Sequence, residues 1–186
     1  NLFVGIKELD SKLKYFIFVT AVFTLANFGL YVFLLLKAQK MAGNIVIPLL
    51  FFALFYLMWS SLSIPFGKLS DRIGRKKVLM TGYILFFLVI IGFIFVNTLW
   101  LLGILFALFG IVYAITQSNQ RAVVADLAGN MKGTAIGFYY FIIGLVNIFA
   151  GLIAGLFWDV SPTAMFVYIA IVTIISIVCL SFVREK

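Results

Sequence analysis

The sequence has no histidine, one cysteine and only six acidic residues among its 186. Without histidine there is no His-based acid–base pair or triad, and a single cysteine can form neither an internal disulfide nor a Cys/His metal site. That residue, Cys179, lies within an apolar run, where we expect it to be a small packing residue. No nucleophile, acid pair or metal cluster of the kind that catalysis needs is recognisable, so the sequence predicts no enzyme, no metal site and no cofactor.

Charge of either sign is also scarce: 11% of the residues are charged, whereas 65% are hydrophobic. Soluble proteins carry about a quarter charged residues, so this composition predicts an integral membrane protein. The net charge is +8, but the basic residues do not alternate with aromatics along an amphipathic element, as nucleic-acid binding would favour. They gather at the ends of apolar runs, and we therefore expect membrane lipids, and no nucleic acid, as partners.

Long apolar runs are what the chain does have. An apolar stretch of about 20 residues is long enough to cross the hydrocarbon core as a helix. Six stretches meet that length and predict an all-α membrane protein with helices at 15–36, 45–66, 78–97, 99–120, 134–157 and 163–183. The six-helix domain then covers 15–183, between an N-terminal segment 1–14 and a tail 184–186. The chain begins with Asn1 and not with Met, so we expect it to be a piece of a longer protein.

The basic residues predict the orientation of these helices. On one side lie the segment before the first span, the loop 67–77, the fourth-to-fifth connection and the tail, which together hold most of the lysines and arginines. The other side has only Lys37 and Lys40. Because basic loops stay in the cytoplasm, we expect a multi-pass protein of the cell membrane with both termini cytoplasmic.

Four spans carry a polar stripe on one face. Lipid offers polar groups no partner, so we expect the stripes of spans one, two, four and five to line a pathway for a small-molecule substrate. The candidate pathway residues are Thr24, Asn27, Tyr31, Gln117, Gln120, Tyr140 and Asn147. The fourth span also carries Tyr113 on its stripe, and the second span offers Tyr56, Ser60 and Ser63. A single Ser, Thr or Tyr often only bonds to a neighbouring helix or to backbone, and this alternative applies to the two serines and to Thr20.

The third and sixth spans have few polar side chains, and we expect them to be peripheral and to face lipid. Polarity thus falls from span one to three and again from span four to six. This pattern predicts two three-helix repeats, at about 15–97 and 99–183, with the second inverted because each repeat has an odd number of spans. The glycine face of the fifth span, at Gly137, Gly144, Gly151 and Gly155, predicts close helix packing.

The loop GKLSDRIGRKK, residues 67–77, concentrates basic charge around two glycines and one carboxylate. We expect Gly67 to end the second helix and Gly74 to adopt a left-handed turn. Asp71 is placed to accept backbone N–H groups at a helix N-terminus and to pair with Arg72 or Arg75. A loop that only sets topology would need the charge but not these residues at fixed offsets.

This loop resembles the signature of the major facilitator superfamily, G-x-L-x-D-R-x-G-R-[KR]-x, and occupies the same place between the second and third helices of a six-helix half. Residues 117–159 resemble the tenth-to-eleventh-helix region of prokaryotic members, and residues 23–39 resemble their seventh helix. The resemblance implies the C-terminal half of a secondary transporter that works by alternating access. Its partner would be an N-terminal six-helix half or a second copy of the chain.

The resemblance also implies a cytoplasmic gate. In the family the aspartate of the loop contacts the other half, and its arginine engages an acidic residue at the end of the fourth helix, a role that Asp126 fits. The implied gating residues are Gly67, Asp71, Arg72, Gly74, Arg75, Arg121 and Asp126. A structural or assembly role, as a homodimer or an isolated six-helix fragment, remains the alternative. The 22 phenylalanines permit a hydrophobic organic substrate, but they are also common filler in membrane helices.

Overall fold

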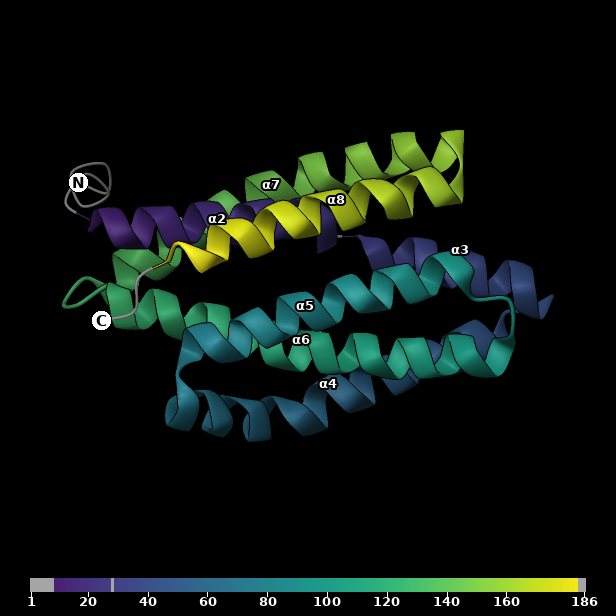
Figure 1. The fold of residues 1–186 in the computed structure, drawn as a ribbon, viewed down its shortest axis with the longest axis horizontal. Helices are drawn as coiled ribbons and strands as arrows, with labels where there is room; N and C mark the ends of the chain where they lie inside the picture. The colour runs from purple at the N-terminus through teal and green to yellow at the C-terminus, as the bar shows by residue number, and fades with distance from the viewer. Residues whose placement is uncertain (1–8, 28, 184–186) are drawn as a thin grey trace.

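In the part of the chain that the structure describes, seven helices form a single elongated bundle (Figure 1). The computed structural model describes residues 9–27 and 29–183, and within them it has no strand. The helices are α2 (Ser11–Asn27), α3 (Leu30–Ala42), α4 (Val46–Ile73), α5 (Arg75–Phe95), α6 (Leu99–Leu127), α7 (Lys132–Val160) and α8 (Pro162–Ser181). Taking α2 and α3 as one span, six segments are long and apolar enough to cross a membrane. The predicted all-α fold with six spans is confirmed.

The first span is broken, although the sequence predicted one helix over 15–36. It divides into α2 and α3 at Gly29, whose φ of 75° lies in a region that a helix cannot use and that favours glycine. A Cβ atom at Gly29 would lie 4.0 Å from the Cα atom of Gly151 in α7, so the break rests against that helix. Irregular backbone at membrane depth is tolerated where protein covers it or where it lines a cavity.

The second correction concerns the end of the second span. α4 continues through Gly67 to Ile73, so the prediction that Gly67 ends this helix was wrong. Nothing in the packing interrupts the helix there, since no neighbouring atom lies within 4 Å of a Cβ built at Gly67. The break falls instead at Gly74, where φ is 101°. Only this one residue separates α4 from α5, and the signature loop is therefore mostly helical.

The helices pack in a pattern with internal symmetry. α4 and α5 pack on α6, as α7 and α8 pack on α2, and α5 and α8 pack on each other. Exchanging spans one, two and three with spans four, five and six maps these contacts onto one another. Equivalent helices lie three positions apart in the order of spans, and successive spans alternate in direction. The two units therefore run in opposite directions. An inverted three-helix repeat produces this arrangement.

Burial is unequal among the helices. α6 is the most buried, and α5 and α8 bury one face that includes Tyr83, Phe93 and Phe166. Their other faces expose apolar side chains such as Leu88 and Ile174, and lipid contact there stays a prediction. α4 and α7 are the least buried helices. One side of the bundle is thus left open between these two helices.

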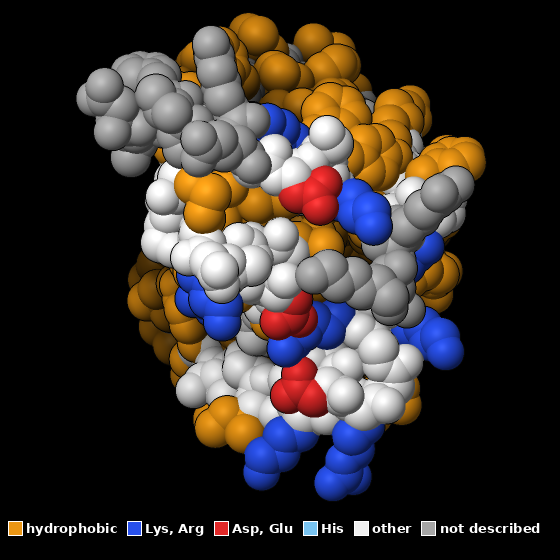
Figure 2. Space-filling model, turned by 90° about the vertical axis from the view of Figure 1, so that its left-hand side faces the viewer, with side chains coloured by type: hydrophobic (Ala, Val, Ile, Leu, Met, Phe, Trp, Pro, Cys, Tyr) orange, Lys and Arg blue, Asp and Glu red, His pale blue; other side chains and the backbone are white. Residues whose placement is uncertain are grey.

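Charge is concentrated at one end of the bundle. The end that carries the α4–α5 junction and the C-terminus of α8 displays basic side chains together with acidic ones (Figure 2). At the opposite end, Lys37 donates a hydrogen bond to the carbonyl oxygen of Phe93 and lies over the Phe166 ring, 5.3 Å from its centroid. This distribution of charge between the two ends agrees with the grouping of basic segments in the sequence, from which the orientation was predicted.

Gly110 sets the close approach of α4 and α6. A Cβ atom there would clash with the backbone oxygen of Phe55, which cannot move without shifting α4. We therefore expect Gly110→Ala to destabilise the protein by about 1–2 kcal/mol, since overpacking outweighs the gain in helix propensity. Gly92→Ala is the matched control, because its Cβ would meet only the movable end of the Leu105 side chain, at 2.6 Å. Thermal unfolding of both variants in detergent is the measurement, and equal stability would contradict this packing.

Candidate functional site

A hollow of about 410 Å³ lies between α2, α3, α4, α6 and α7, on the open side of the bundle. All seven candidate pathway residues lie on its wall: Thr24, Asn27, Tyr31, Gln117, Gln120, Tyr140 and Asn147. The other lining residues are Phe55, Tyr56, Trp59, Tyr113, Tyr139, Ile143 and Gly144. Among the described residues, none that lines the hollow is acidic or basic. The break between α2 and α3 brings Asn27 and Tyr31 to this wall from two separate helices.

Gln120 is held in a buried hydrogen-bond network at the wall. Its Nε2 donates to the hydroxyl of Tyr83 at 3.0 Å, and the hydroxyl of Tyr139 donates to its Oε1 at 3.4 Å. Tyr83 stacks on Phe23 with ring centroids 3.8 Å apart. The network therefore joins α2, α5, α6 and α7. Tyr83 was missed in the sequence because its span has few polar side chains and was expected to face lipid. A phenol in such a span is the signal that could have identified it.

The other polar side chains differ in whether their hydrogen-bonding atoms have partners. The hydroxyl of Thr24 donates to the carbonyl oxygen of Thr20 at 2.8 Å, and the hydroxyl of Thr20 donates to that of Ile17. By contrast, the Oδ1 atoms of Asn27 and Asn147 are buried and have no donor among the described residues. An unpaired buried oxygen costs about 1–3 kcal/mol. The two amides therefore keep an unused capacity to accept hydrogen bonds.

Aromatic rings make up the opposite part of the wall. Trp59 stacks on Tyr56 at 5.5 Å and meets Tyr113 edge-on at 5.1 Å, and Phe55 meets Tyr113 edge-on at 5.1 Å. We call these four residues the aromatic wall. The sequence pointed to Tyr56 and Tyr113 but not to Phe55 and Trp59. Positions 55, 56 and 59 share one face of α4. That shared face is the signal that could have identified Phe55 and Trp59.

An ion-pair cluster lies at the charged end of the bundle. The Nη2 atom of Arg75 lies 3.0 Å from Oδ1 of Asp71, and its Nε lies 2.5 Å from Oδ2 of Asp126. Arg75 thus links the α4–α5 junction to the end of α6, as the resemblance implied. The two carboxylate side chains are 61% and 57% exposed, so solvent weakens both pairs. The N-cap residue of α5 is Gly74, which makes no side-chain cap hydrogen bond. A contact of Asp71 with a helix N-terminus of another half stays a prediction.

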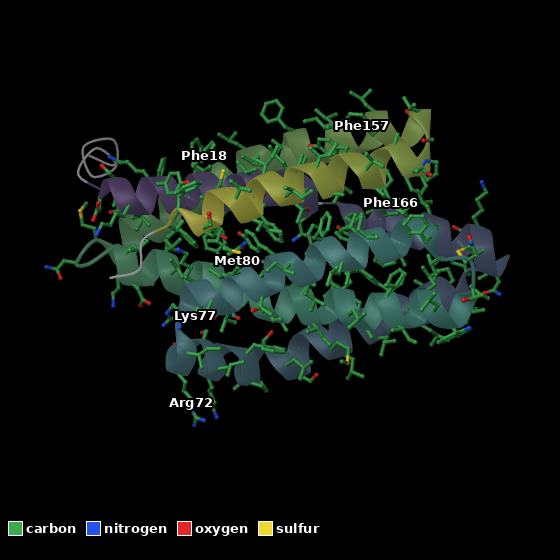
Figure 3. The ribbon with its side chains drawn as sticks, in the orientation of Figure 1. Phe18, Arg72, Lys77, Met80, Phe157 and Phe166 are labelled. Carbon is green, nitrogen blue, oxygen red and sulfur yellow. The ribbon has the colours of Figure 1, made fainter. Side chains whose placement is uncertain are left out.

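The remaining gating candidates lie outside this cluster. Arg72 is exposed, points away from the helices (Figure 3) and forms no ion pair with a described acidic residue. Arg121 donates from Nε to the carbonyl oxygen of Gln117 at 3.1 Å. Lys76, which is not among the implied gating residues, donates to the carbonyl oxygen of Ser181 at 2.8 Å. The junction is therefore fastened to the ends of both α6 and α8.

Comparison with known proteins gives one family. The Major Facilitator Superfamily model matches residues 16–186. An uncharacterised MFS-type transporter of Methanocaldococcus jannaschii is 44% identical over 97% of this chain and 47% of its own length. The multidrug resistance protein MdtG of Proteus mirabilis is 30% identical over 69% of the chain and 33% of its own length. The chain thus spans about half the length of the first of these relatives.

The cluster predicts a measurable coupling between Arg75 and Asp126. In a double-mutant cycle with Arg75→Gln and Asp126→Asn, we expect the two changes together to cost about 0.2–1 kcal/mol less than their sum, as for other exposed ion pairs. Salt should reduce this coupling. The cycle of Asp126→Asn with Arg72→Gln is the control and should give none, since Arg72 has no such partner. Additive effects in the first cycle would contradict the pair.

Proposed function

The chain belongs to the major facilitator superfamily, and from this premise we propose that it is the C-terminal half of a secondary transporter that moves a small molecule by alternating access. The hollow carries the proposal. It gathers every candidate pathway residue on a wall whose described residues carry no charge, and the least buried helices, α4 and α7, form part of that wall. A structural domain would have no need for buried amides without partners on such a wall, because each of them costs stability.

An N-terminal half of the same protein is the partner that fits the open side. The chain matches 47% of the length of its Methanocaldococcus relative, which leaves room for a second unit of similar size. On α7, Gly137, Gly144, Gly151 and Gly155 have no neighbouring atom within 4 Å of a built Cβ, so another helix can approach closely. Tyr56 and Tyr140 are about half exposed on the same side. Lipid would offer their hydroxyls no partner, which favours protein and water there.

The ion-pair cluster supports a role in gating at the cytoplasmic end. Arg75 and Lys76 tie the α4–α5 junction to α6 and α8, so these elements would move together as one body. Asp71 remains mostly exposed and can reach a helix N-terminus of the other half, a contact of about 0.3–1 kcal/mol. A contact of this size can bias two gate states that differ by a few kcal/mol. In this proposal Gly74 supplies the turn, and Arg72 and Arg121 contribute only charge.

The solute is proposed to be a small organic molecule, because the wall is aromatic and polar but uncharged. The name of the relative MdtG, multidrug resistance protein, is in keeping with this class. The location is proposed to be the cell membrane, with the charged end of the bundle and both termini in the cytoplasm.

The orientation can be tested by labelling single cysteines in intact cells, after replacing Cys179. We expect a cysteine at the exposed position Lys77 to react with a membrane-impermeant thiol reagent only after the cells are opened. A cysteine at Asn44, which lies at the other end of the bundle, should react from outside. Labelling of position 77 in intact cells would reverse the proposed orientation.

Alternating access can be tested with a cysteine at Gln117 in the full-length protein. A wall that opens to each side in turn should let this cysteine react with an impermeant reagent in right-side-out and in inside-out vesicles. Leu88→Cys, on the outer face of α5, is the control and should react in neither. Reaction from one side only, or equal reaction of the two variants, would count against alternating access. The alternative partner is a second copy of this chain. In that case the six-span chain, purified by itself, would have twice the mass of a single copy.

A further inference from the structure

We propose that a second hollow, at the end of the bundle opposite the α4–α5 junction (Figure 1), binds the phosphate of an anionic membrane lipid. This hollow has a volume of about 660 Å³ and lies where the ends of α3 and α5 approach the α7–α8 junction. Its lining includes Leu36, Lys37, Lys40, Val96, Asn97 and Trp158. It shares no lining residue with the hollow of the proposed pathway, so the site is separate from that pathway.

The charge of this second hollow has one sign. Lys37 and Lys40 are one helical turn apart on α3, so their like charges repel each other. Lys40 is exposed and can contact a ligand directly. Lys37 is half-buried and donates a hydrogen bond to the carbonyl oxygen of Phe93, but neither lysine forms an ion pair with a described acidic residue. An anion would relieve the repulsion and supply the counter-charge that a partly buried cation needs.

The other acidic groups near this end do not supply that counter-charge. No acidic residue is among the described lining of the second hollow. Asp159 follows Trp158 in the chain, but it is exposed and is not part of the lining. The first turn of α8, which begins at Pro162 on the wall, contains no acidic residue.

The inverted repeat offers a direct comparison with the charged end of the bundle. Exchange of the two three-helix units maps the end of α3 onto the end of α6, and the α7–α8 junction onto the α4–α5 junction. At the charged end, the corresponding hollow is lined by both Arg75 and Asp126, which pair with each other. The second hollow has cations without such a carboxylate. A counter-charge is thus built into the described chain at one end and left to a ligand at the other.

The depth of the second hollow favours a lipid over a free ion. α5 has 21 residues, and at 1.5 Å per residue it is about 30 Å long, which is the thickness of the hydrocarbon core. Its end at Phe95 therefore marks the level of the lipid headgroups, and Val96 and Asn97 on the wall follow directly. Tryptophan is enriched at this level of a membrane, and Trp158 is on the same wall.

The rest of the wall suits the glycerol and the upper acyl chain of a lipid. Leu36 is 44% exposed, and Met41 and Val96 add apolar surface beside it. A free phosphate would leave this surface in contact with water, whereas an acyl chain would cover it. The amide of Asn97 is exposed and can donate to a phosphate or ester oxygen. In the proposed orientation the lipid belongs to the outer leaflet, but the site itself does not depend on the orientation.

The test uses the full-length protein in detergent and a phosphatidylglycerol with a photoactivatable diazirine close to its headgroup. After illumination the protein is digested and the label is located by mass spectrometry, so this hollow is measured separately from other lipid contacts. Unlabelled phosphatidylglycerol, phosphatidylcholine and inorganic phosphate are the competitors. The variants are Lys40→Gln, Lys40→Arg and the control Lys77→Gln, which removes the same charge from an exposed position at the other end of the bundle.

We expect saturable labelling in the segments 36–41, 96–100 and 158–162. Lys40→Gln should weaken the apparent affinity at these segments about fivefold, because one basic residue beside an anionic lipid contributes about that factor. Lys40→Arg should keep the affinity, and Lys77→Gln should leave it unchanged at these segments. Phosphatidylcholine should compete at least about fivefold more weakly than phosphatidylglycerol, and inorganic phosphate at the same concentration should not compete.

Several outcomes would overturn the inference. Labelling that spares all three segments, or that Lys40→Gln and Lys77→Gln reduce equally there, would reject the site. Equal competition by phosphatidylcholine would reject the preference for an anionic lipid, and equal competition by inorganic phosphate would identify a soluble anion in its place. Lys40 is chosen over Lys37 because Lys37 also bonds to Phe93, so its replacement would remove a packing contact as well as a charge.

Discussion

The hydrocarbon core of a membrane offers no hydrogen-bond partner, and this constraint organises the whole structure. Each polar group must bond within its own helix, bond to another helix or face a cavity. Thr20 and Thr24 take the first solution, bonding along their own helix. Gln120, Tyr83 and Tyr139 take the second. The amides of Asn27 and Asn147 have no donor for their Oδ1 atoms and lie on the wall of the hollow. The same rule explains why the irregular backbone at Gly29 rests on α7.

The charged end of the bundle and the hollow are connected through the helices that they share. Arg75 holds α6 at the charged end of the bundle through Asp126, and the same helix carries Tyr113, Gln117 and Gln120 at the hollow. In the proposed transporter, a change in how the α4–α5 junction contacts the other half would therefore act on helices that line the hollow. Because the carboxylates are exposed, each pair contributes little free energy. Weak pairs of this kind would suit the proposed gate, whose contacts must break and re-form.

Much of the fold could be predicted from sequence, because length and polarity decide which segments cross a membrane and which faces turn inward. The stripe of Thr24, Asn27 and Tyr31 followed from helical periodicity, and all three line the hollow. Local conformation was less predictable. Gly67 and Gly74 look alike in sequence, but only Gly74 adopts a positive φ. Trp59 and Phe55 were missed because aromatic residues are common in any membrane helix. Only the fold shows that they meet Tyr113 from a different span.

The central claim is that these six spans are one of two bodies that rock against each other around the hollow. The distance between Arg72, which is exposed on α4, and the corresponding loop of the other half reports this motion most directly. Spin labels at the two positions in the full-length protein, measured by double electron–electron resonance, give the distribution of that distance. The account predicts two populations, whose ratio shifts when Arg75→Ala loosens the ion-pair cluster. A single narrow distance that this substitution leaves unchanged would contradict it.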